Sequence, residues 1–79
     1  MKRGQIVQHF KGDFYIVEDL AIDANTGKRL VVYRALYGES TLYVRDYDEF
    51  MSKLDRRKYH DSKYELRFTP VFIKSVKGL

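Results

Sequence analysis

The chain has 79 residues, no cysteine and a formal net charge of +4, which indicates one small domain with a single thin core. Without cysteine, neither disulfides nor a thiolate metal site can stabilise it. No apolar stretch approaches the roughly 18 residues that cross a bilayer, and no signal peptide is visible, so we expect a cytoplasmic protein with no membrane partner.

The basic excess is confined to the last third of the chain. Residues 1–52 hold seven Lys or Arg and eight Asp or Glu, giving −1, whereas residues 53–79 hold eight and three, giving +5. This asymmetry is typical of a protein that binds a polyanion. A solvated loop and tail give the same composition, and they are the commoner cause.

Apolar alternation and turn residues predict five strands, at residues 5–10, 14–22, 29–37, 41–45 and 64–69. Within the second strand, Glu18 and Asp19 interrupt the alternation, which predicts a β-bulge there. Gly27 can take the positive φ that closes a hairpin loop between the second and third strands. The fourth strand places Leu42 and Val44 on one face.

A short helix is predicted to begin after Asp46. Asp46 and Glu49 match a capping box. In this motif the side chain of the N-cap residue accepts the amide of the residue three positions later, and the side chain of that residue accepts the amide of the N-cap residue. The residues that follow form an apolar helical stripe: Tyr47, Phe50, Met51 and Leu54. We therefore expect two helical turns that cover an open end of the sheet.

The end of the chain is predicted to be less regular. Residues 55–63 read as a charged loop, and residues 71–79 read as a semi-ordered tail. Pro70 lacks an amide donor, so it either ends the last strand or lies on a sheet edge. Five strands, tight turns and one helix predict an all-β fold, a strongly bent antiparallel sheet that rolls or closes to protect its edges.

Several segments in order carry a family resemblance: QHFKG (8–12), TG (26–27), LVVYRALYG (30–38) and LYVR (42–45). The chain resembles a bacterial family, domain of unknown function sixteen fifty-three, over residues 6–69. The resemblance implies a single domain, 1–79, with an SH3-like barrel, and it implies no mechanism. The chain departs from the family pattern at Tyr43, where tryptophan is usual, at Asp46, where proline is usual, and at the basic stretch 56–60.

No motif in the sequence indicates an enzyme. His9 and His60 are the two histidines, and no serine lies in a nucleophile elbow. Metal-ligand and glycine-rich phosphate motifs are also lacking. The acidic cluster 46–49 is explained by the capping box, and a lone histidine at a strand end is usually a hydrogen-bonded structural residue. We expect no catalytic residue, no metal and no cofactor.

Aromatic and basic side chains instead favour a binding module. Most of Phe10, Tyr15, Phe50 and Phe68 is assigned to the core, since a thin core without tryptophan needs aromatic rings. Eight other side chains are candidates for ligand binding: Arg34, Tyr37, Tyr43, Arg45, Arg56, Arg57, Lys58 and Tyr59.

Two ligand classes fit these candidates. In one hypothesis, nucleic acid binds the basic C-terminal third through phosphate contacts and stacking on Tyr59. In the alternative, a protein or peptide binds an aromatic surface around Tyr37 and Tyr43. Salt dependence distinguishes the two, because phosphate contacts weaken steeply with salt. Arg34 interrupts an apolar strand, and its partner is either Glu18, Glu49 or a ligand.

Overall fold

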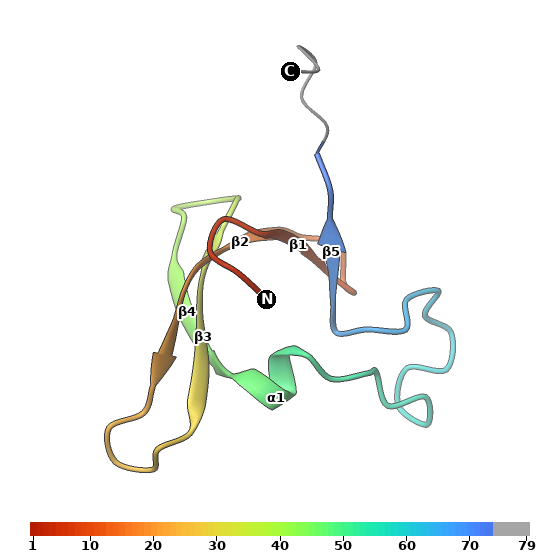
Figure 1. Ribbon diagram of the computed structural model, residues 1–79. Helices are drawn as coiled ribbons and strands as arrows, with labels where there is room; N and C mark the ends of the chain where they lie inside the picture. The colour runs from red at the N-terminus through yellow and green to blue at the C-terminus, as the bar shows by residue number, and fades with distance from the viewer. Residues whose placement is uncertain (74–79) are drawn as a thin grey trace.

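A computed structural model describes residues 1–73 as one antiparallel sheet and one short helix (Figure 1). The elements are β1 (Ile6–His9), β2 (Phe14–Ile22), β3 (Arg29–Ala35), β4 (Leu42–Asp46), α1 (Tyr47–Phe50) and β5 (Phe68–Val71). The all-β prediction is therefore confirmed. Of the predicted tail 71–79, Val71 lies in β5, and residues 74–79 lie outside the described part.

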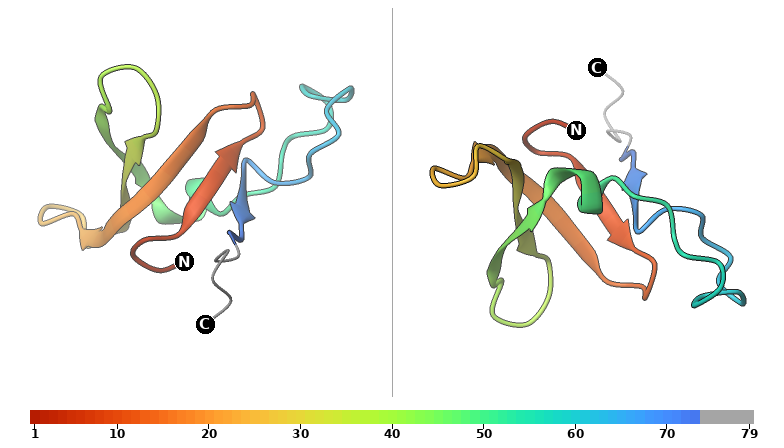
Figure 2. Two further views of the ribbon diagram at one scale, coloured as in Figure 1. Left: turned by 90° about the horizontal axis from the view of Figure 1, so that it is seen from above. Right: turned by 90° about the horizontal axis from the view of Figure 1, so that it is seen from below.

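The five strands form one sheet in the order β4-β3-β2-β1-β5. Successive hairpins join β1 to β4, and β5 returns to pair with β1. Within residues 1–73, β4 and β5 are edge strands that do not pair with each other, so the predicted closed barrel is not confirmed. Figure 1 shows the strands as an arch with α1 at its open end, and Figure 2 shows β4 and β5 on opposite sides of β1 and β2.

The predicted bulge in β2 is confirmed. Val17 pairs with Tyr33 of β3, but the next pair is Asp19 with Val32, so one residue of β2 is left over. An extra residue reverses the alternation, because side chains on a strand point to opposite faces in turn. As a result Val17 and Leu20 face the same, concave side of the sheet.

The core fills the concave side of the sheet. It is formed by buried residues from four of the strands and the helix: Val7, Val17, Val31, Tyr33, Phe50 and Phe68. The predicted core positions Phe50 and Phe68 are buried, whereas Phe10 and Tyr15 are only partly buried. Valine and aromatic side chains suit this face, since they pack well on a pleated surface.

The helix is shorter than predicted. Asp46 is its N-cap, as expected, and its carboxylate accepts the amides of Asp48 at 2.9 Å and Glu49 at 3.3 Å. The helix ends at Phe50, so the prediction of two helical turns is wrong. Leu54 is buried nonetheless, in the loop that follows the helix, where its N–H donates to the Glu65 carbonyl at 2.8 Å.

Residues 51–67, which we call the long loop, connect α1 to β5 and project away from the sheet (Figure 1). The predicted strand 64–69 is wrong in its first half, where the loop holds only an isolated bridge between Lys53 and Leu66. Regular pairing begins at Phe68, opposite His9 of β1. Pro70 lies in this edge strand, in agreement with one of its two predicted positions.

Candidate binding surfaces

Four tyrosines meet on the concave side of the sheet, and we call them the aromatic surface: Tyr15, Tyr33, Tyr37 and Tyr43. Tyr33 and Tyr43 are cross-strand partners in β3 and β4, and their rings stack with centroids 5.7 Å apart. Tyr37 follows β3, and its hydroxyl hydrogen-bonds that of Tyr15 at 2.8 Å. Strand pairing therefore places the rings of Tyr15, Tyr33 and Tyr43, and the hydroxyl bond to Tyr15 links Tyr37 to them.

Two of these tyrosines are exposed and two support them. Tyr37 is 42% exposed and Tyr43 is 40% exposed, whereas Tyr33 is buried and Tyr15 is partly buried. Burial and the bond to Tyr37 raise the pKa of Tyr15 above its usual value. The neighbouring Tyr37 raises the pKa of Tyr43. Both hydroxyls are therefore neutral at physiological pH, and a neutral hydroxyl can donate one hydrogen bond and accept others.

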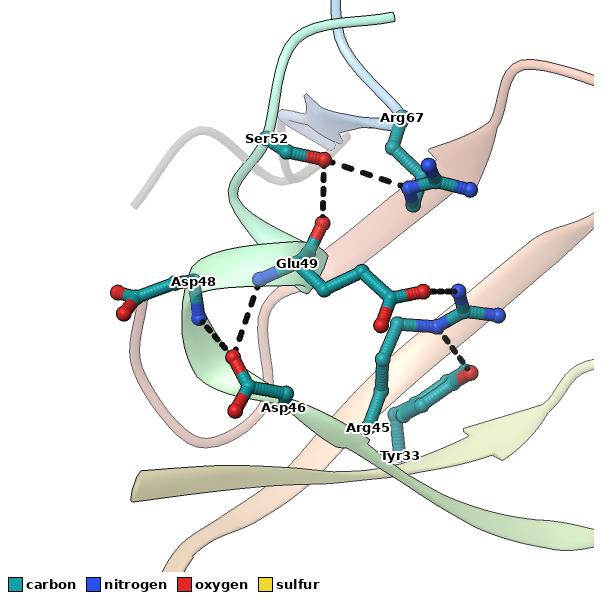
Figure 3. A network of polar contacts seen from close by, with 7 residues as sticks. All are labelled: Tyr33, Arg45, Asp46, Asp48, Glu49, Ser52 and Arg67. Atoms are coloured by element: carbon teal, nitrogen blue, oxygen red, sulfur yellow. Dashed lines mark hydrogen bonds and ion pairs between the residues drawn. The ribbon is translucent and has the colours of Figure 1, made fainter. Parts of the chain in front are cut away.

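Arg45 lies beside Tyr33 of the aromatic surface and is held by internal partners (Figure 3). Its Nε donates to the Tyr33 hydroxyl at 3.1 Å, and its Nη1 donates to the Glu49 carboxylate at 2.7 Å. The guanidinium also lies over the Phe68 ring, 5.5 Å from its centroid. Its charge is thus compensated within the fold, and this candidate residue supports the tyrosines rather than standing free.

Arg34 does not join the aromatic surface. Its cross-strand partners are Ile16 and Leu42, which lie on the convex face, opposite to Tyr33. Its Nε donates to the Glu18 carboxylate at 3.1 Å, and its Nη1 donates to the Ser40 carbonyl at 2.9 Å. The expected internal pair with Glu18 is therefore present, and the alternative pair with Glu49 is wrong.

The basic candidates lie together in the long loop. Arg56 donates to the Ser62 carbonyl at 2.6 Å, so its guanidinium holds the loop together. Arg57 extends into solvent with only a loose ion pair to Asp55, at 3.6 Å. Lys58 lies over the ring of Tyr59, 5.4 Å from its centroid. Two of the three adjacent basic side chains therefore remain available to solvent.

A row of ring contacts joins the long loop to the aromatic surface. Tyr59 packs on Phe10 at 4.7 Å, Phe10 on His9 at 4.4 Å, and His9 on Phe68 at 4.9 Å between centroids. Phe68 in turn packs on Tyr15, at 5.8 Å. The two groups of candidate residues are therefore parts of one continuous aromatic layer.

His9 sits in the middle of this layer. Its Nδ1 accepts the N–H of Lys11 at 3.2 Å, which agrees with a structural histidine. Burial lowers its pKa, and the positive charges of Arg45, Arg67 and Lys11 lower it further. Sequence reasoning did not predict that Arg67 lies near His9. Their proximity depends on the pairing of β1 with β5, and these two strands are far apart along the chain.

The sequence analysis placed Tyr15 among the residues assigned mostly to the core. Its side chain shares the concave face with Val17, which lies two residues further along β2. This two-residue spacing could have predicted that Tyr15 lies beside Tyr33.

Within residues 1–73, no three His, Asp or Glu side chains gather as they would around a metal ion. In the same part of the chain, no helix has the length and apolarity that crossing a bilayer requires.

Comparisons with known proteins agree with this fold. The model of the family described as "Protein of unknown function (DUF1653)" matches residues 5–70. The chain is similar to the crystal structure of a DUF1653 protein from Bordetella bronchiseptica, with 26% identity and a TM-score of 0.72. That similarity covers 90% of this chain and 87% of the other. No curated protein matches the chain.

Proposed function

Because the chain belongs to the DUF1653 family, whose function is unknown, we propose that it is a non-catalytic module that binds a protein or peptide through the aromatic surface. The observation that carries this proposal is the exposure of Tyr37 and Tyr43 above two supporting tyrosines. Rings that are already fixed lose little entropy on binding, and tyrosine presents both apolar area and a hydroxyl.

The charges around the aromatic surface support a peptide over a polyanion. Arg45, beside Tyr33 of the aromatic surface, is neutralised by Glu49. On the opposite face, Arg34 is neutralised by Glu18. Phosphate binding needs cations that are free to replace counterions, and these two arginines are already paired. An uncharged peptide segment does not need free cations in order to bind.

The test begins with peptides selected from a random heptapeptide library against the purified protein. Their affinities are then measured by fluorescence anisotropy for the wild type and for Tyr37→Ala and Tyr43→Ala. Aromatic residues at the centre of an interface cost about 2 kcal/mol or more when truncated, so we expect roughly a thirtyfold loss for each variant.

Phe14→Ala is the matched control, since Phe14 has the same 42% exposure as Tyr37 but lies on the convex face, opposite Gln8 of β1. It should leave peptide affinity unchanged. Equal losses for all three variants, or a library that yields no binder, would contradict the proposal.

A second candidate function, nucleic-acid binding, is favoured by one observation. In the long loop, Arg57 and Lys58 are both exposed, Lys58 lying over the ring of Tyr59, so two adjacent cations are available for phosphate contacts. The continuous aromatic layer joins this loop to the aromatic surface. A steep salt dependence of binding would identify this ligand class.

A further inference from the structure

The two edge strands of the sheet are protected to different degrees. β5 contains Pro70, which cannot donate to an added strand, and the long loop leads directly into it. β4 has no proline and no lysine over its five residues. The charged residues of β4, Arg45 and Asp46, lie at its C-terminal end and have internal partners, so the edge is open along Leu42, Tyr43 and Val44.

The hydrogen-bond register of β4 can be read from its first pair. The N–H of Ala35 donates to the Thr41 carbonyl at 3.0 Å, which makes these opposite residues a hydrogen-bonded pair. Antiparallel pairs alternate, so Tyr43 of β4 also exchanges hydrogen bonds with β3. The main-chain groups of Leu42 and Val44 consequently point away from β3, toward the open edge.

The side chains along this edge are exposed and apolar. Leu42 is 49% exposed and Val44 is 63% exposed, both on the convex face. Tyr43, between them, contributes to the aromatic surface on the concave face. A strand added here would therefore meet apolar side chains on one face and tyrosine rings on the other.

We propose that a partner peptide binds in an extended conformation as an additional strand beside β4. This proposal rests on the proposed peptide-binding function and specifies how the peptide is held. Main-chain hydrogen bonds to Leu42 and Val44 supply affinity, and alternate side chains supply specificity. The peptide carries apolar or β-branched residues at alternate positions and no proline among its paired residues.

A second copy of this chain is a poorer occupant of the edge. β4 has five residues, which span roughly 17 Å at about 3.4 Å per residue. A strand of this length offers a second copy and a peptide the same main-chain hydrogen bonds, so the side chains that meet across the pair decide between them. An antiparallel second copy centred on Val44 places the Asp46 carboxylate opposite the apolar Leu42. A peptide with an uncharged residue opposite Leu42 avoids this mismatch.

The experiment compares two variants at Val44 with the selected heptapeptides as probes. Val44→Pro removes the outward N–H without removing a hydrogen bond to β3, and edge strands tolerate proline. Val44→Thr keeps both the N–H and the shape of the side chain. We expect Val44→Pro to weaken binding by about tenfold or more, as for the loss of a main-chain hydrogen bond, and Val44→Thr to bind nearly as the wild type does.

Modified peptides repeat the test on the wild-type protein, so that it does not depend on the folding of Val44→Pro. N-methylation of the amides along one edge of the peptide should abolish binding, and N-methylation along the other edge should not. Only the edge that faces β4 needs its donors. Amide hydrogen exchange at Leu42 and Val44 should also slow when an unmodified peptide binds.

The outcomes separate the two proposals. If Tyr37→Ala weakens binding but Val44→Pro and both N-methylated peptides bind normally, the strand addition is wrong and the aromatic surface remains the binding site. If no peptide binds, both proposals fail. If the wild type is a dimer in sedimentation and Val44→Pro is a monomer, a second copy occupies the edge and the peptide proposal is overturned.

Discussion

The rings of Phe50 and Phe68 lie nearly parallel, with centroids 4.1 Å apart and 7° between their planes. Phe50 comes from α1 and Phe68 from β5, so this contact joins the helix to an edge of the sheet. The space between β4 and β5 is thus bridged by side-chain packing, where a closed barrel has main-chain hydrogen bonds. Phe50 and Phe68 are also two of the six buried residues that form the core.

Phe50→Ala should destabilise the fold by about 3–5 kcal/mol, because it removes a fully buried ring and leaves a cavity against Phe68. The free energy of unfolding from urea titration checks this value. Met51→Ala, one residue along and exposed, is the control and should change it little. A loss below about 1 kcal/mol for Phe50→Ala would show that the site collapses around the cavity.

Arg45→Ala should cost more stability than Glu49→Ala. The first change leaves the buried Tyr33 hydroxyl without its partner and removes packing on Phe68, at a cost of about 1–3 kcal/mol. The second removes an ion pair that is partly open to solvent, worth about 0.2–1 kcal/mol. Urea unfolding of both variants tests the order, and a larger effect of Glu49→Ala would contradict it.

Asp46→Ala should destabilise the protein by about 1 kcal/mol, since the amides of Asp48 and Glu49 lose their acceptor. Asp46→Asn is the matched control, because its side-chain oxygen still accepts these bonds. Thermal unfolding of both variants measures the difference. If asparagine and alanine were equally destabilising, the carboxylate charge rather than the cap would be responsible.

The stability of the protein should fall as the pH drops below the unfolded-state pKa of histidine, about 6.5. Burial lowers the pKa of His9 in the folded state, so the unfolded chain binds the proton more strongly. Its contribution is complete above pH 6.5 and is lost as the pH falls through the lower, folded value.

Unfolding free energies measured between pH 5 and 8 for the wild type and His9→Gln test this dependence, since the variant should lose part of the slope. His60→Gln, at an exposed position in the long loop, is the control. A wild type and His9→Gln with identical pH profiles would contradict the prediction.

The triple change Arg56→Ala, Arg57→Ala and Lys58→Ala tests the nucleic-acid candidate. If the long loop binds phosphates, single-stranded RNA or DNA should bind the wild type with a dissociation constant around 10⁻⁴–10⁻⁶ M near physiological salt. The triple variant should bind more weakly with a flatter salt slope. Because Arg56 also holds the loop through Ser62, Arg57→Ala with Lys58→Ala alone is the control for loop structure.

The strands were predictable because their signals are local. Alternation predicts β2, a run of β-branched and aromatic residues predicts β3, and Gly27 adopts the positive φ expected of its hairpin. Even the bulge at Glu18 could be inferred, because two charged residues break the apolar alternation. The capping role of Asp46 was equally local.

The features that were missed depend on distant contacts. Met51 and Leu54 continue the helical stripe in sequence, yet the helix ends at Phe50, and the N–H of Leu54 donates to the Glu65 carbonyl across the long loop. The start of β5 is set by pairing with β1 rather than by its own alternation. Likewise, the side of the sheet on which Arg34 lies follows from the pairing of β3, and no local pattern reveals it.

The pairing of β1 with β5 has a consequence for the order of folding. Ile6 lies opposite Val71, so the last strand joins the sheet only when nearly the whole chain is available. The hairpins from β1 to β4 close short loops and meet early, whereas the β1–β5 closure spans the entire domain and carries a larger entropic penalty. During synthesis, the edge of β1 that faces β5 and the ring of Phe50 therefore lack their partners until Phe68 has emerged.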